Sequence, residues 1–302
     1  MSSTMLQLVQ QVTNELGVST PNSVAGNTNQ DIIQILALMN ASGYELLRRA
    51  DWQELTKQYQ FYTQYTQTTG NWTTAARTIT GIPSTAGLST NYQVVGTGIG
   101  NATYITSVDS LTQVTVSQDF TQAGGTNATV YFQQVKYDLP SGYVSMVPRT
   151  HWDKSKRWEL MGPESAQQWE WLLSGYISTG PRIRWRLLAN SFQIWPGSST
   201  AELIGYEYRS NLWAYAADGT PKTSFTIDTD TTMYSDRLVV LNTKLKYFEA
   251  KGLDTTAIYR DYLQELETCI AQDTSATNLS FAPRPATVLI GYDNIPDSGY
   301  SF

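Results

Sequence analysis

The spacing of apolar residues predicts two amphipathic helices at the start of the chain. In residues 3–16 and again in residues 31–50, apolar side chains return at helical spacing, which places them on one face of a helix. Gly17 directly follows the first segment and is a typical helix stop. Gly43 lies on the apolar face of the second segment, where the missing side chain would let another helix approach closely. We therefore expect the fold to begin with two antiparallel helices.

After residue 55 the pattern changes to the alternation of apolar and polar positions that is typical of half-buried strands. Tyr59, Phe61 and Tyr65 fall on one side of the first such stretch. Residues 71–134 continue the alternation in short segments between turn signals, and they contain fourteen Thr and seven Gly but only three charged residues. This uniform composition predicts a separate all-β module, a small barrel or sandwich, inserted into the chain.

Residues 135–273 combine strand signals with helices. A short helix should follow Pro163, which is favoured at the first helical position. Two longer amphipathic patterns at 235–251 and 255–273 predict further helices. The remaining segments indicate an antiparallel sheet. Its strand signals lie at 137–148, 182–196 and 202–213.

The last stretch, residues 274–302, has no periodicity and is interrupted by prolines. We predict an extended C-terminal arm, which at ~3.3 Å per residue could reach at most roughly 95 Å. Its apolar side chains have no fold of their own to enter, so we expect them to dock on another surface. These candidate docking residues are Phe281, Val288, Leu289, Ile290, Tyr292, Tyr300 and Phe302.

Together these patterns predict an α+β chain in four parts. Residues 1–70 supply a helix pair and a first strand, and residues 135–273 supply the sheet and the later helices. The helices of these two parts should form one helical bundle beside the antiparallel sheet. The inserted β module takes residues 71–134, and the arm takes residues 274–302.

Composition and charge restrict the classes of partner. The chain of 302 residues is 41% hydrophobic, so it can bury a large core. Only 15% of its residues are charged, compared with roughly 25% in typical globular proteins. The formal charge of -6 argues against a face that grips nucleic-acid phosphates. We expect any contact with DNA to be transient and nonspecific.

The single cysteine and the absence of long apolar runs indicate the compartment. Cys269 alone allows neither an intrachain disulfide nor a cysteine-based zinc site, and a buried inert thiol is expected. The first residues lack the basic region of a secretory signal, and no apolar run approaches the ~18 residues of a membrane span. We therefore expect a protein that is made in a reducing cytoplasm and does not contact a membrane.

Two motifs could carry chemistry, but each has a simpler interpretation. His151 is the only histidine, so a triad would depend on it alone, and a hydrogen-bonded loop residue is the simpler interpretation. The string GTGIG at 96–100 is similar to a phosphate-binding loop, but it lies among Thr-rich strand segments with no helix after it. We interpret it as a glycine turn.

A group of carboxylates and tryptophans gives the strongest enzymatic alternative. Glu159, Glu164 and Glu170 lie near Trp158, Trp169 and Trp171 in the sequence, as the carboxylates and aromatic platforms of a glycan hydrolase do. However, Glu164 and Glu170 occupy positions expected on a solvated helix face. Five tryptophans of the chain also fall at core-facing positions, namely Trp158, Trp169, Trp185, Trp195 and Trp213. We assign no catalytic, cofactor or metal site and expect a protein that is not an enzyme.

Basic residues along 235–251 leave two interpretations open. Arg237, Lys244, Lys246 and Lys251 could form a stripe that faces DNA, or they could simply be the solvated face of a helix. The second arrangement is the more common one.

Three segments carry a resemblance to a known family. They are YDLPSGYVSMVP at 137–148, LIGYEYRSNLW at 203–213 and DRLVVLNTKLKYFEAKGLD at 236–254. In this order, behind an N-terminal helix pair that contains YELLRRADWQEL at 44–55, they resemble the head-to-tail adaptor proteins of short-tailed and related bacteriophages. Residues 85–118 are similar to a small β module that recurs in phage tail and virion proteins.

The resemblance implies a structural function in the virion. A helical-bundle ring, commonly twelvefold, would bind under the portal protein, pass genomic DNA through its channel and receive the tail nozzle or tail tube, with tail fibres as a further possible partner. An acidic channel would repel the DNA backbone and let it slide. The alternatives are another phage tail or fibre-anchoring protein and a glycan hydrolase.

Overall fold

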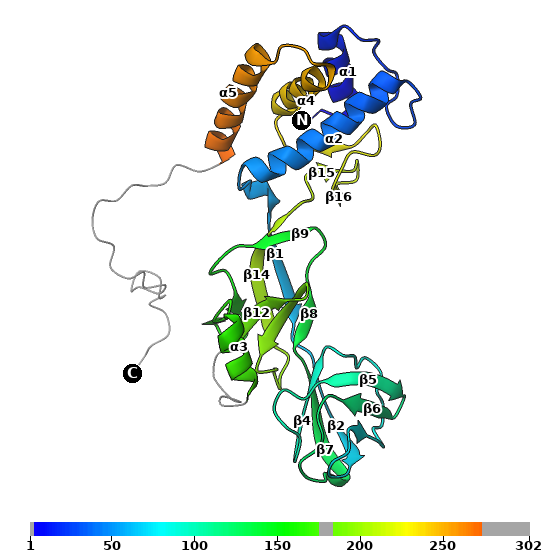
Figure 1. Cartoon of the computed structure of the whole chain (residues 1–302), viewed down its shortest axis with the longest axis vertical. Helices are drawn as coiled ribbons and strands as arrows, with labels where there is room; N and C mark the ends of the chain where they lie inside the picture. The colour runs from blue at the N-terminus through cyan, green and yellow to red at the C-terminus, as the bar shows by residue number, and fades with distance from the viewer. Residues whose placement is uncertain (1–2, 175–183, 274–302) are drawn as a thin grey trace, which may run out of the picture.

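The computed structural model describes residues 3–174 and 184–273 as an elongated molecule with helices at one end (Figure 1). This helical end comprises residues 3–55 and 211–273. Residues 56–64, 135–174 and 184–210 form a middle part, and residues 65–134 form a β unit at the opposite end. The strands in the sheets pair in antiparallel fashion. The prediction of an α+β chain with antiparallel sheets is therefore confirmed.

The helices begin and end where local capping chemistry is favourable. Thr4 caps the first helix in a capping box with Gln7, and Gly17 ends it with a left-handed φ of 70°. The Asn29 side chain caps the second helix. The short third helix is capped by Ser165, so Pro163 lies before its cap rather than at its first position. The α-helices are α1 (Met5–Leu16), α2 (Gln30–Arg49), α3 (Ala166–Leu173), α4 (Asp236–Lys251) and α5 (Thr256–Asp273).

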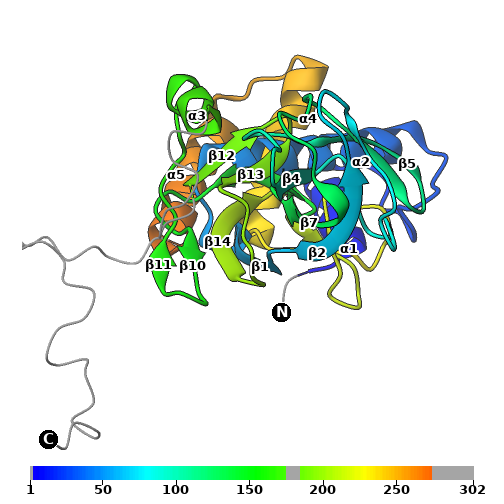
Figure 2. The same cartoon turned by 90° about the horizontal axis from the view of Figure 1, so that it is seen from below.

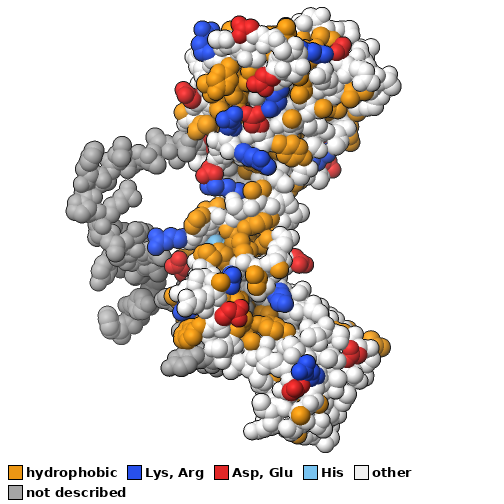
Figure 3. Space-filling model, in the orientation of Figure 1, with side chains coloured by type: hydrophobic (Ala, Val, Ile, Leu, Met, Phe, Trp, Pro, Cys, Tyr) orange, Lys and Arg blue, Asp and Glu red, His pale blue; other side chains and the backbone are white. Residues whose placement is uncertain are grey.

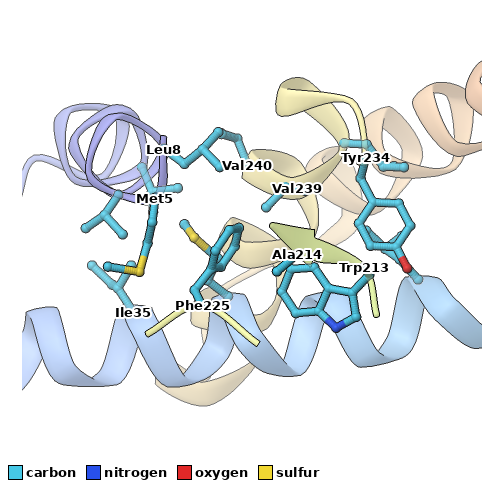
Figure 4. Packing of buried hydrophobic residues seen from close by; sticks show 14 of the residues in the cluster. Met5, Leu8, Ile35, Trp213, Ala214, Phe225, Tyr234, Val239 and Val240 are labelled. Carbon is cyan, nitrogen blue, oxygen red and sulfur yellow. The ribbon is translucent and has the colours of Figure 1, made fainter. Parts of the chain in front are cut away.

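Helices α1, α2, α4 and α5 share one core at the helical end, although they come from opposite ends of the sequence. Short strands close this core from one side. They are β15 (Ala214–Tyr215), β16 (Pro221–Lys222) and β17 (Thr231–Thr232). The labelled side chains in Figure 4 come from α1, α2, α4 and the segment between β14 and α4. They are Met5, Leu8, Ile35, Trp213, Ala214, Phe225, Tyr234, Val239 and Val240.

A close contact at Gly43 fixes the position of α2 against this core. A Cβ atom at Gly43 would lie 2.2 Å from Cζ2 of Trp213, whose side chain is completely buried. Figure 4 shows the Trp213 indole lying against α2. The prediction that a helix approaches at Gly43 is therefore wrong, because the space is filled by an aromatic ring.

Two antiparallel sheets build the middle part. Their inner faces share an aromatic core that includes Tyr206 and Phe192. Ala189 and Asn190, with φ values of 49° and 57°, form a two-residue turn between β12 and β13. The larger sheet contains β1 (Thr56–Tyr62), β14 (Leu203–Ser210), β9 (Tyr143–Met146), β10 (Trp152–Asp153) and β11 (Trp158–Glu159). The smaller contains β8 (Lys136–Asp138), β12 (Arg184–Leu188) and β13 (Ser191–Trp195).

Strand β1 shows the predicted alternation only in part. Tyr59 and Phe61 face the aromatic core, and Gln58, Gln60 and Tyr62 are exposed. Tyr65 does not continue this row. It begins the next strand and is exposed, whereas Thr63, which extends the pairing of β1 by donating its backbone N–H to the carbonyl of Glu202, is the buried residue that continues the row.

The β unit has two three-stranded sheets around its own core. One side of this core is formed by Trp72, Val94 and Phe132. Strand β2 pairs with β7 along its length, so the unit begins at Tyr65 and the sequence-based boundary at 71 falls within a strand. The strands are β2 (Tyr65–Trp72), β3 (Thr78–Ile79), β4 (Tyr92–Gly96), β5 (Ile105–Ser110), β6 (Gln113–Val116) and β7 (Gly125–Gln134).

The chain enters and leaves the β unit at neighbouring points. The backbone N–H of Gln134 donates to the carbonyl of Gln64 over 2.9 Å. The unit also touches the middle part, because Ala102 and Tyr104 pack against Trp169 and Trp195. The β unit is therefore joined to the middle part by two neighbouring backbone segments and by a small side-chain contact.

Replacing residues 65–134 by a short Gly-Ser link should leave the rest of the protein folded. The link has to span only the gap between Gln64 and Val135, and the cores of the two other parts contain no residue of the β unit. We expect a loss of about 1–3 kcal/mol, from uncovering Trp169 and Trp195. Urea unfolding followed by circular dichroism measures it. An unfolded product would show that the β unit is required for the fold of the middle part.

Candidate functional site

His151 is built into an aromatic stack. Its side chain is 2% exposed, and its ring lies 3.9 Å from the ring of Trp185 and 5.5 Å from that of Tyr206, measured between centroids. Its Nε2 atom lies 3.0 Å from the sulfur of Met146. Burial lowers the pKa of His151 to about 4. The residue precedes β10 as a loop residue should, but its neutral ring is part of the aromatic core.

The shifted pKa of His151 predicts acid-sensitive stability. The unfolded chain takes up a proton near pH 6.5, whereas the folded chain resists it until about pH 4. The stabilisation is therefore complete above pH ~6.5 and is lost as the pH falls to ~4, by about 3 kcal/mol in total. Unfolding free energies measured across this range should fall less steeply for His151→Phe. Parallel curves for the two proteins would contradict the assignment.

The carboxylates and tryptophans near α3 do not form the predicted alternative site. Glu164 is almost completely buried and forms an ion pair with Arg184, so it is not available as a free acid. Trp169 is buried as expected, but Trp158 is 39% exposed, and its prediction as a core residue is wrong. This difference arises because β11 is a two-residue edge strand with both residues exposed. The arrangement gives no support to a glycan hydrolase.

The other two sequence motifs have structural functions. The glycine string at 96–100 turns the chain after β4, and the carbonyl of Gly98 accepts hydrogen bonds from the backbone and side chain of Thr121. Cys269 is half-buried on α5, where burial raises the pKa of its thiol. In the part of the chain that the structure describes, no group of three or more His, Cys, Asp or Glu side chains is placed to hold a metal ion.

The basic residues of α4 join the helices to one another. Lys244 contacts Glu15 of α1 over 2.7 Å, and Lys246 pairs with Glu45 of α2. The other two pairs are Arg237 with Glu265 over 3.3 Å and Lys251 with Asp31 over 3.7 Å. This row is therefore neither a free stripe for DNA nor a simply solvated face, because each cation has a carboxylate from another helix beside it.

The outer face of α2 carries an exposed apolar stripe. Ile33, Ala37, Ala41 and Tyr44 are all exposed and recur every three or four residues, opposite the buried face of the helix. The stripe is about 16 Å long. Figure 1 shows α2 across the front of the helical end, and hydrophobic side chains reach the surface on that face in Figure 3. Exposed apolar patches of this kind mark contacts with other molecules.

Sequence reasoning missed the α2 stripe, although its signal was present. The segment 31–50 has apolar residues on more than one face of the helix, and only one face can enter the core. The predicted docking residues Phe281, Val288, Leu289, Ile290, Tyr292, Tyr300 and Phe302 lie outside the described residues.

The protein matches no family model, and no curated protein matches it. Over residues 3–174 and 184–273, no helix has the length and hydropathy needed to cross a lipid bilayer. The candidate site is the α2 stripe.

Proposed function

We propose that the protein is a structural component of a tailed-phage virion, the head-to-tail adaptor whose copies form a ring under the portal. The observation that carries this proposal is the α2 stripe. An elongated subunit with an apolar stripe along the outer face of a long helix is suited to side-by-side packing with further copies of itself.

The order of parts along the molecule supports the same assignment. Two of the three segments that resemble adaptor proteins fall on β14 of the middle part and on α4 of the helical end. In this proposal the helices form the ring-forming bundle, and the β unit is an inserted module that faces outward. The arm at 274–302 would dock on the portal protein, and the tail nozzle or tail tube would bind on the opposite side. Tail fibres are a further candidate partner.

Electron microscopy of the purified protein, with and without the portal protein of the same phage, tests the proposal. We expect closed rings on the portal and monomers without it. Ala37→Glu should prevent ring closure, because it places a charge within the stripe. Ala257→Glu, at an exposed position of α5, is the matched control and should still allow rings. Labelling that places the chain in a distal fibre of the virion would refute the proposal and favour a fibre-anchoring protein.

A further inference from the structure

Among the described residues, the unpaired positive charges are concentrated in one region. At the helical end, most basic side chains have a carboxylate partner, including every basic side chain of α4. Within residues 3–174 and 184–273, the Lys and Arg side chains that have no such partner lie in the middle part, with the exception of Arg48. The net charge of -6 therefore conceals a separation of charge along the molecule.

Three of these unpaired cations surround one shallow hollow on the outer face of the larger sheet. Arg149 precedes β10, Lys154 directly follows it, and Arg157 lies just before β11. All three side chains are exposed. The hollow has a volume of about 520 Å³, and Gly205 of β14 contributes a position without a side chain to its wall. In Figure 2, β10 and β11 lie at the edge of the molecule, where a large partner can reach them.

Nearby carboxylates only partly offset these charges. Asp153 lines the hollow but is almost completely buried, and its Oδ1 atom accepts hydrogen bonds from the backbone N–H groups of Ser155 and Lys156. Glu207 is half-buried in the same wall, and Glu159 lies opposite Trp152 in the strand register. None of these carboxylates forms an ion pair with the three cations. The cations remain free to bind an external anion.

The backbone conformation at both arginines is unfavourable for a residue with a side chain. Arg149 has a φ of 63° and Arg157 a φ of 59°, in the left-handed region where glycine and asparagine are tolerated best. An arginine at each of these positions destabilises the loop relative to glycine. Arginine at these two positions is consistent with a use of the side chains outside the packing of the subunit.

We propose that this hollow is a contact site for the phosphate backbone of double-stranded DNA. The proposal rests on the proposed function, in which genomic DNA passes along the protein. The hollow is shallow and open, which suits the side of a duplex better than a small molecule that has to be enclosed. Three charge contacts give weak binding that is sensitive to salt, so DNA can bind the site and still slide past it. The paired cations of the helical end offer no second site of this kind.

Binding of a fluorescently labelled duplex of about 20 base pairs to the full-length protein, followed by anisotropy at several salt concentrations, tests the proposal. With three phosphate contacts, a fourfold rise in salt should weaken binding by roughly 40-fold. The triple variant Arg149→Gln, Lys154→Gln, Arg157→Gln should bind at least about tenfold more weakly at low salt and lose most of this salt dependence. The substituted side chains are exposed, so the fold should be retained.

The matched control removes the same charge elsewhere. Arg237→Gln, Lys251→Gln, Arg260→Gln neutralises three exposed cations of the helical end that already have carboxylate partners, and it should bind DNA as the unchanged protein does. Equal loss in both variants, no loss in either, or no binding by the unchanged protein would overturn the proposal. Equally tight binding of polyglutamate would overturn the assignment to DNA. Because the assay contains no portal protein, its result is independent of the test for ring assembly.

Discussion

Replacing Gly43 by valine should destabilise the helical end by about 3 kcal/mol. Helix propensity alone predicts the opposite sign, since valine is a better helix former than glycine by a few tenths of a kcal/mol. Packing decides the outcome. A Cβ at this position would lie 2.2 Å from the Trp213 ring, and that ring is completely buried and lies 4.9 Å from the ring of Phe225, between centroids. The indole cannot move away without disturbing the core around it.

The matched control for this prediction is Ala41→Val, on the exposed side of the same helix. It adds the same β-branched side chain at a position with free space, so it should change the unfolding free energy by less than about 1 kcal/mol. Urea unfolding of both variants, followed by tryptophan fluorescence, measures the difference. If Gly43→Val is no less stable than Ala41→Val, the contact between Gly43 and Trp213 does not limit the approach of α2 to the core.

Local patterns predicted most of the elements of this fold. The helix at 3–16 ends at Gly17 because glycine adopts the left-handed conformation that stops a helix, and this property is readable from the residue type. The hairpin at Ala189-Asn190 is local in the same sense, since its turn joins adjacent strands. Periodicity and turn chemistry depend on near neighbours in the sequence, so a single sequence carries them.

Contacts between distant segments could not be predicted in the same way. Lys244 and Glu15 form an ion pair across most of the length of the chain, and nothing in the local pattern around Lys244 distinguishes a paired cation from a solvated one. The cluster of unpaired cations at Arg149, Lys154 and Arg157 could not be predicted for the same reason. The net charge of the chain is a sum over all residues and does not show that the fold gathers these three on one surface. Candidate sites made of surface residues depend on these long-range placements.

Truncation after Asp273 should leave the described body folded but abolish its binding to the portal protein. Asp273 ends α5, and its carboxylate accepts a hydrogen bond from the backbone N–H of Gln53 over 2.8 Å, so the body keeps this closing contact in the truncated protein. The removed residues carry the seven apolar side chains that we expect to dock on the portal. Thermal unfolding of the truncated protein should therefore be nearly unchanged.

The expected loss of binding is large because, in the proposed ring, every subunit would repeat the contact. If about four of the apolar side chains are buried on the portal, at ~1.5 to 3 kcal/mol each, the gross gain is about 6 to 12 kcal/mol per subunit before ordering costs. Even a small surplus per subunit becomes strong attachment when many subunits bind together. A pull-down with purified portal protein measures the effect.

A full-length variant distinguishes the effect of the apolar side chains on portal binding from the effect of removing the whole arm. Val288→Ser, Leu289→Ser, Ile290→Ser should weaken portal binding strongly, since these three residues form the longest apolar run of the segment. The matched control Thr274→Ser, Thr277→Ser, Asn278→Ser changes polar residues in the same segment and should bind normally. If the truncated protein binds the portal as well as the full chain does, residues 3–273 make the contact. Substitutions in the α2 stripe would then be the first test of where on these residues the portal binds.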